Sequence, residues 1–154
     1  AMQDEWSTDF GVGCKYFSQD AVIKLAPAAG IALDETLSPA EKLKVVQALM
    51  EKDDPGAQAI FETIGAYLAY AVVLYSQFYD IEHMMMLGRV MSGKGGDTIL
   101  RVCNEILADE YGWSSSVPNL SDKLKRGSLR YGEAVELADV LGYDIVWQKR
   151  REVR

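Results

Sequence analysis

A stretch of 17 residues without a charged side chain, residues 63–79, most constrains how this chain folds. A membrane-spanning helix needs roughly 20 apolar residues, whereas this stretch is shorter and holds tyrosine, serine and glutamine side chains. A chain of 154 residues is long enough to bury such a segment in the core of one domain. We therefore expect residues 56–79 to form the central helix of a protein core, with no membrane as a partner.

Helix-start signals precede this segment. Ser38 and Glu41 have the spacing of a capping box, and Pro39 suits the first helical position, so a helix is expected from there to about residue 50. Ser18 predicts the start of an earlier helix that Gly30 terminates.

The region after residue 80 combines an apolar run with a glycine cluster. Residues 83–88 end in a glycine and predict a buried strand, with a helical turn as the alternative. The glycines of residues 93–96 predict a loop, and Asp97 predicts the cap of a helix over residues 97–111. Such a glycine loop is either a plain connection or an approach to phosphate or ribose. The expected fold class is mainly α, with a small β element.

The formal charge changes sign near Gly112. Residues 1–112 carry 17 acidic and 8 basic side chains, which gives −9, and residues 113–154 carry 6 and 8, which gives +2. We therefore expect two parts, 1–112 and 113–154, and the helix 97–111 is a candidate member of both. An acidic body repels nucleic acid, so any affinity for nucleic acid must come from the basic tail. The alternative interpretation is that the basic side chains of the tail simply form a solvated surface.

The two cysteines, Cys14 and Cys103, lie far apart in the sequence and have no metal-ligand spacing. Free thiols in a reducing compartment are therefore expected rather than a disulfide. The N-terminus is acidic where a signal peptide needs basic residues. These features predict a cytoplasmic protein without a bound metal.

Three segments carry a resemblance in their order and spacing. Residues 13–18 resemble the end of a zinc motif, residues 57–69 a long helix, and residues 86–93 a strand and glycine turn. Together, over residues 10–111, they resemble the C-terminal lobe of the ROK family (repressor, open reading frame, kinase), which comprises sugar kinases and sugar-responsive repressors of the actin-like ATPase fold. The resemblance implies contacts to the adenosine half of ATP or ADP from Gly88, Arg89, Ser92, Gly93, Gly95 and Gly96.

Several parts of that family's machinery have no counterpart here. In the family the phosphate loops, the sugar-contacting residues and the catalytic aspartate lie upstream of the first residue of this chain. Only Cys14 represents the zinc cysteines, His83 has no companion ligand, and Arg89 replaces the second glycine of the adenosine turn. We therefore expect no structural zinc, no catalytic residue and no independent kinase activity.

The tail resembles a different family. Residues 119–131 and 133–143 resemble the second half of Cro-like helix-turn-helix regulators, and residues 106–114 resemble the preceding helix and turn. In that family a recognition helix enters the major groove of DNA. Here Pro118 predicts that this helix begins at residue 118, displaced from its usual position in the family's pattern. The resemblance implies base contacts from Ser115, Ser116 and Asn119, and phosphate contacts from Lys123, Lys125, Arg126 and Arg130.

The extreme C-terminus alternates apolar and polar residues over 144–149, as a short edge strand or an extended terminus would. Trp147 is expected to anchor on a core rather than to serve as a stacking platform, because no second aromatic residue accompanies it at a suitable sequence spacing.

Three functional hypotheses follow. The leading one is a non-catalytic, DNA-binding transcriptional regulator, and the first alternative is a ROK-type sugar kinase fragment that retains part of a nucleotide site. The second alternative is a homo-oligomeric interaction module, with a dimer favoured, because a lobe without its partner lobe exposes apolar surface. Its interface residues would be Tyr67, Tyr70, Tyr75, Phe78 and Tyr79.

Overall fold

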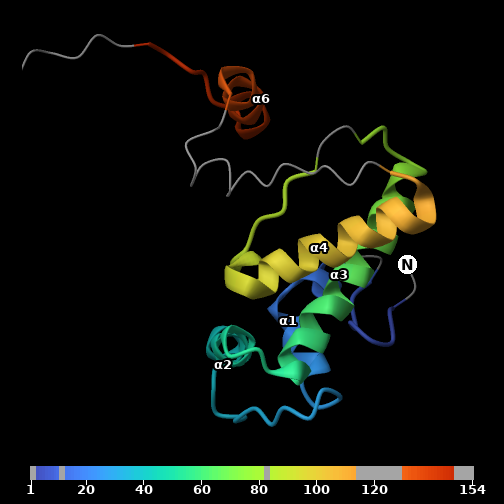
Figure 1. The fold of residues 1–154 in the computed structure, drawn as a ribbon, viewed down its shortest axis with the longest axis vertical. Coiled ribbons are helices and arrows are strands. Elements are labelled where there is room, and N and C mark those ends of the chain that lie inside the picture. The colour runs from blue at the N-terminus through green and yellow to red at the C-terminus, as the bar shows by residue number, and fades with distance from the viewer. Residues whose placement is uncertain (1–2, 11–12, 82–83, 114–129, 148–154) are drawn as a thin grey trace, which may run out of the picture. The chain divides into compact units, whose positions relative to one another are not determined.

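The computed structural model describes residues 3–10, 13–81, 84–113 and 130–147, and this part of the chain is mainly helical, as predicted (Figure 1). It contains no strand, and the β-bridge found within it joins Gln3 to Phe10. The predicted small β element is thus reduced to this bridge in the described residues. The chain divides into two compact units, Ala1–Ser115 (unit 1) and Ser116–Arg154 (unit 2).

Unit 1 begins with the 3-10 helix η1 (Cys14–Phe17) and helix α1 (Gln19–Leu25). The predicted cap is confirmed, because the hydroxyl of Ser18 accepts a hydrogen bond from the backbone N–H of Asp20 at 3.1 Å. The helix ends before Gly30, since Pro27 lacks the N–H that the next helical bond requires. Gly30, at φ 75°, then ends the turn that follows.

Helix α2 (Pro39–Glu51) starts with the predicted capping box. The hydroxyl of Ser38 accepts from the backbone N–H of Glu41, and the Glu41 carboxylate accepts from the N–H of Ser38 at 2.9 Å. Helix α3 (Pro55–Ser76) follows, with Asp54 as its N-cap. The expected central helix is confirmed, and it ends at Ser76 instead of residue 79.

Helices α3 and α4 (Gly93–Tyr111) form the main packing pair of unit 1 (Figure 1). Their contacts advance along both helices in the same direction, in the pairs Phe61–Gly95, Gly65–Ile99 and Tyr70–Glu110. The two helices therefore run parallel. A Cβ atom on Gly65 would lie 2.8 Å from the carbonyl oxygen of Ile99, so only glycine permits this approach.

The core of unit 1 lies where α1, α2 and α4 meet α3. Its largest fully buried side chains are those of Phe61, Leu43, Ile60, Ile64, Ile99, Val22 and Val46. Helix α3 is also the one helix in the described part of the chain that is long and apolar enough to cross a membrane by length and composition. Core helices pass the same test, so this property alone does not assign α3 to a membrane.

The strand predicted at residues 83–88 is not formed by its described part. Met84 and Leu87 are exposed, and only Met86 packs against the core. Gly88, at φ 127°, then leads into the 3-10 helix η2 (Arg89–Met91). A strand needs a neighbouring strand to satisfy its backbone groups, and the described residues provide none.

The predicted glycine loop is instead the first turn of α4, and Asp97 lies within the helix rather than at its cap. Glu51 of α2 takes the role expected of Asp97, because its carboxylate accepts from the backbone N–H of Lys94 at 3.1 Å. The Lys94 ammonium in turn lies 2.9 Å from the Asp53 carboxylate. The prediction failed because the capping group comes from a distant part of the sequence.

The described element of unit 2 is helix α6 (Tyr131–Leu141). It ends in a left-handed glycine, Gly142 at φ 74°, and the N–H of Tyr143 donates to the carbonyl of Ala138 at 2.8 Å. This is a common glycine-terminated helix ending. Residues 143–147 form no strand, so the edge-strand alternative is wrong for this segment.

Candidate functional site

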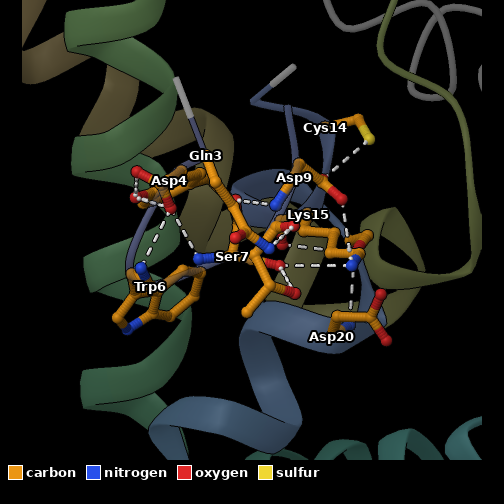
Figure 2. Close-up of polar contacts among 11 residues, drawn as sticks. Gln3, Asp4, Trp6, Ser7, Asp9, Cys14, Lys15 and Asp20 are labelled. Carbon is orange, nitrogen blue, oxygen red and sulfur yellow. Dashed lines mark hydrogen bonds and ion pairs between the residues drawn. The ribbon is translucent and has the colours of Figure 1, made fainter. Parts of the chain in front are cut away.

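A cluster of polar contacts joins residues 3–9 to residues 14–16 near the start of unit 1 and is called the N-terminal clasp here (Figure 2). Asp4 is its centre. Its carboxylate accepts hydrogen bonds from the backbone N–H groups of Trp6 at 3.1 Å and Ser7 at 2.5 Å, and from the Tyr16 hydroxyl at 2.9 Å. These donors, the Ser7 N–H first, lower the pKa of the Asp4 carboxyl.

A lysine joins the second half of the clasp. The Lys15 ammonium lies 3.0 Å from the Asp9 carboxylate and donates to the carbonyl of Ser7 at 3.2 Å. The hydrogen bond to Asp9 raises the pKa of the Lys15 ammonium. The thiol of Cys14 lies 3.7 Å from the same carboxylate. The lysine therefore ties the N-terminal turn to η1.

An aromatic cluster seals the clasp against α3. Trp6 stacks on Tyr16 with ring centroids 4.6 Å apart, and Tyr67 of α3 meets Tyr16 edge-on at 5.4 Å. The Lys24 ammonium lies 4.9 Å from the centre of the Trp6 ring. These contacts hold the first residues of the chain against α1 and α3.

The charged groups of the clasp are suited to stabilising the fold and not to acid–base catalysis. The pKa of Asp4 is lowered and that of Lys15 is raised, so both stay charged at neutral pH, whereas a general acid or base needs a pKa near the working pH. Within the described residues, no group of three or more His, Cys, Asp or Glu side chains is placed to hold a metal ion. Sequence reasoning missed the clasp, although an aspartate with a serine three residues later is a turn signal.

The six residues predicted to contact nucleotide do not form one open loop. Gly88 and Arg89 line a cleft of about 370 Å³ between residues 17–20 and 87–90. Gly95 and Gly96 are buried in α4 instead, where Cβ atoms would strike the Phe61 ring and the backbone of Met91.

The start of α4 is also occupied by protein groups. Ser92 is the N-cap of the helix, and Gly93 is its first residue. The carboxylate of Glu51 lies next to Gly93 and accepts from the N–H of Lys94, where a phosphate would otherwise bind. Close helix packing therefore accounts for these glycines without a nucleotide.

Most of the predicted DNA contacts lie outside the described residues. They are Ser115, Ser116, Asn119, Lys123, Lys125 and Arg126. Arg130 is described: it is exposed, and its carbonyl accepts from the N–H of Ala134 at 3.1 Å, in the first turn of α6. His83 also lies outside the described residues.

Several large apolar side chains are exposed in the last turns of α3, in the residues that follow it, and at the end of α4. Tyr70, Tyr75, Phe78 and Tyr79 are 38% to 73% exposed, and Leu74, Tyr111 and Trp113 add to them. The Tyr70 hydroxyl donates to the Glu110 carboxylate at 3.2 Å, which links the two helix ends. We call these side chains the α3–α4 end surface. Tyr67, predicted with them, belongs to the clasp instead.

The prediction that Trp147 anchors on a core is wrong. Its side chain is 84% exposed, and its ring stacks on that of Tyr131, with centroids 5.9 Å apart and planes at 26°. The sequence did not predict Tyr131 as the partner of Trp147, because the length of α6 separates the two residues along the chain.

Both cysteines are free, as predicted. Cys14 is exposed, while Cys103 is buried between α4 and its neighbours, and burial raises the pKa of the Cys103 thiol to about 11. The Cys103 thiol is therefore not activated by its surroundings.

The chain matches no protein-family model, no curated protein and no solved structure. The resemblances to the ROK and Cro-like families therefore stay predictions.

Proposed function

We propose that this protein is a non-catalytic, DNA-binding regulatory protein whose tail, residues 113–154, contacts duplex DNA. The observation that carries the proposal is the segregation of charge along the chain. Unit 1 has a formal charge of −9, whereas residues 123–130 hold four basic side chains and no acidic one. A basic cluster of this kind neutralises DNA phosphates. The acidic unit 1 is repelled by the same phosphates, so the tail is the part of the chain that would contact the duplex.

Two features of the described residues support a binding role over an enzymatic one. The charged side chains of the N-terminal clasp are paired with one another, and the glycines of α4 are used in packing. Helix α6 overlaps residues 133–143, one of the segments of the tail that carry the Cro-like resemblance.

The test is binding of a fluorescently labelled duplex at low salt, measured by anisotropy. The double variant Lys125→Ala/Arg126→Ala removes two positive charges from the cluster and should weaken binding at least tenfold. The matched control, Lys44→Ala/Lys52→Ala, removes the same charge from exposed positions on α2 and at its C-cap in unit 1 and should leave binding unchanged. Undetectable binding at low salt, or equal loss in both variants, contradicts the proposal.

A second function, self-association, is favoured by the α3–α4 end surface. Phe78 and Leu74 are 73% and 51% exposed there, and apolar clusters of this kind mark protein interfaces. We expect a dimer in sedimentation velocity that Leu74→Ser/Phe78→Ser converts to a monomer. Val45→Ser, at an exposed valine of α2, is the control. A monomer at every concentration of the wild type contradicts this function.

A further inference from the structure

A cleft in unit 1 is used by neither of the functions proposed above. One of its walls is formed by residues 17–20, where η1 leads into α1, and the other by residues 87–90, which lead into η2. Its volume is about 370 Å³. Small-molecule sites in proteins measure about 300–1,000 Å³, so the cleft is large enough for a small ligand.

Hydrogen bonds and a buried side chain hold the two walls in place. On one wall, the Ser18 hydroxyl accepts from the backbone N–H of Asp20 at 3.1 Å. On the other wall, the side-chain amide of Gln47 in α2 donates to the carbonyl of Arg89 at 2.9 Å, and the Val90 side chain is buried. The cleft is therefore preformed, which lowers the cost of binding a ligand.

The lining of the cleft includes one carboxylate and one guanidinium group, and the two are not paired. Among the described residues, no hydrogen bond or ion pair engages the side chain of Asp20 or that of Arg89. Lys15 is close enough to interact with the charge of Asp20, but its ammonium group is bonded to Asp9 at 3.0 Å. The cleft thus offers a ligand one negative and one positive side chain.

Apolar groups complete the lining. Phe17 is partly buried and packs against the core, whereas Leu87 is 73% exposed. An exposed leucine beside a cleft gains burial when an apolar group of a ligand covers it. Gly88 has φ 127°, and no heavy atom lies within 4 Å of the position that a Cβ atom would take there. Open space therefore borders the backbone of this residue.

The charges of the cleft discriminate between classes of ligand. A nucleotide carries several negative charges, which Asp20 repels and only Arg89 attracts. A simple anion or a simple cation leaves one of the two charged side chains without a partner. A zwitterion satisfies both side chains at once.

We propose that this cleft binds a zwitterionic small molecule with an apolar group, which is the chemistry of an apolar α-amino acid. The ammonium group of the ligand bonds to Asp20 and its carboxylate bonds to Arg89, while its apolar group covers Leu87 and Phe17. All of these residues belong to unit 1, so the site goes beyond contact of the tail with DNA and does not depend on it.

The test is an NMR titration of the isotope-labelled full chain with three ligands that share a phenyl ring. L-Phenylalanine carries both charges, phenylpropionate lacks the ammonium group, and phenethylamine lacks the carboxylate. Phenylalanine should shift the amide signals of residues 17–20 and 87–90. It should bind at least about tenfold more tightly than either analogue, because each analogue loses one charged hydrogen bond. Glycyl-L-phenylalanine, which holds the same groups further apart, distinguishes a peptide ligand from a free amino acid.

Each of the two charged side chains has its own variant. Arg89→Ala should weaken phenylalanine binding at least about tenfold and should not weaken binding of phenethylamine, which has no carboxylate. Asp20→Asn should weaken phenylalanine binding and should not weaken binding of phenylpropionate, which has no ammonium group. The matched controls, Lys44→Ala and Asp97→Asn, remove the same charges from exposed positions on α2 and α4 and should keep the wild-type affinity.

The proposal is overturned if neither phenylalanine nor the dipeptide shifts the signals of residues 17–20 and 87–90. Equal affinity for the three phenyl ligands, or undiminished phenylalanine binding in Arg89→Ala and Asp20→Asn, also overturns it. Binding of ADP in this cleft in place of phenylalanine overturns it as well and assigns the cleft to a nucleotide. Lys125→Ala/Arg126→Ala should bind phenylalanine as tightly as wild type, so a failure of DNA binding does not count against the cleft.

Discussion

Two tryptophan–tyrosine pairs of this protein share a local geometry but have opposite surroundings. Trp6 and Tyr16 stack with their planes at 26°, and so do Tyr131 and Trp147. The first pair is enclosed by Tyr67 and tied to the Asp4 carboxylate, whereas Trp147 is 84% exposed. The contrast teaches that ring stacking occurs in two different surroundings: the first pair packs against other elements of unit 1, whereas the second pair is mostly in contact with solvent.

Replacing a helical glycine by alanine in each of the two units should give the largest difference in the free energy of unfolding. Gly95→Ala in α4 places a Cβ atom 2.6 Å from the Phe61 ring, which is fully buried and has no room to move. We expect a loss of about 2 kcal/mol in the free energy of unfolding. Gly132→Ala in α6 meets no atom within 4 Å and should be neutral or stabilising by up to about 1 kcal/mol.

Chemical denaturation of both variants measures this contrast. Equal effects of the two substitutions would show that α3 and α4 do not pack as closely as described.

Removing each tryptophan ring gives the next largest effect. Trp6→Ala loses the contacts to Tyr16, Tyr67 and Lys24, and should cost about 2 kcal/mol of unfolding free energy. Trp147→Ala removes a largely exposed ring and should change stability by less than about 0.5 kcal/mol. Thermal unfolding of both variants tests this, and a larger loss in Trp147→Ala would reverse the comparison.

Acid should weaken the enclosed pair. Hydrogen bonds lower the pKa of the Asp4 carboxyl below its ordinary 3.8, so its stabilisation is present above that pH and is lost as pH falls through the folded-state pKa. The unfolding midpoint of the wild type should therefore exceed that of Asp4→Asn at pH 7, with the difference shrinking below about pH 4. A difference that stays constant from pH 7 to pH 2 would show that the carboxylate does not hold the clasp.

The smallest expected difference is in the reactivity of the two cysteine thiols. Cys14 is exposed and should react with a thiol reagent at neutral pH, whereas Cys103 is buried and its pKa is raised to about 11. We expect one thiol to react in the native protein and both in denaturant. Rapid reaction of both thiols under native conditions would mean that α4 opens readily from the core.

Local signals predicted the helix starts well. Ser18 and Ser38 each cap a helix through atoms two or three residues away, so the sequence alone contains the partners. The long uncharged segment likewise predicted α3, which supplies the largest share of the buried core side chains of unit 1. The class of mainly helical fold follows from these signals.

Features that depend on distant residues were predicted poorly. The start of α4 depends on Glu51, and its glycines depend on Phe61 and Met91, none of which is near in sequence. The apolar run before Gly88 has no period that separates strand from irregular chain. The stacking of Tyr131 on Trp147 likewise required the path of the chain around α6.

The most direct test of the central claim, that the basic tail and not the acidic unit contacts nucleic acid, is the salt dependence of duplex binding. Four phosphate contacts from Lys123, Lys125, Arg126 and Arg130 predict a slope of about −3 to −4 for the logarithm of the binding constant against that of salt concentration. Lys125→Ala/Arg126→Ala should make the slope shallower by about 2. Binding with no salt dependence, or an unchanged slope in the variant, would contradict the claim.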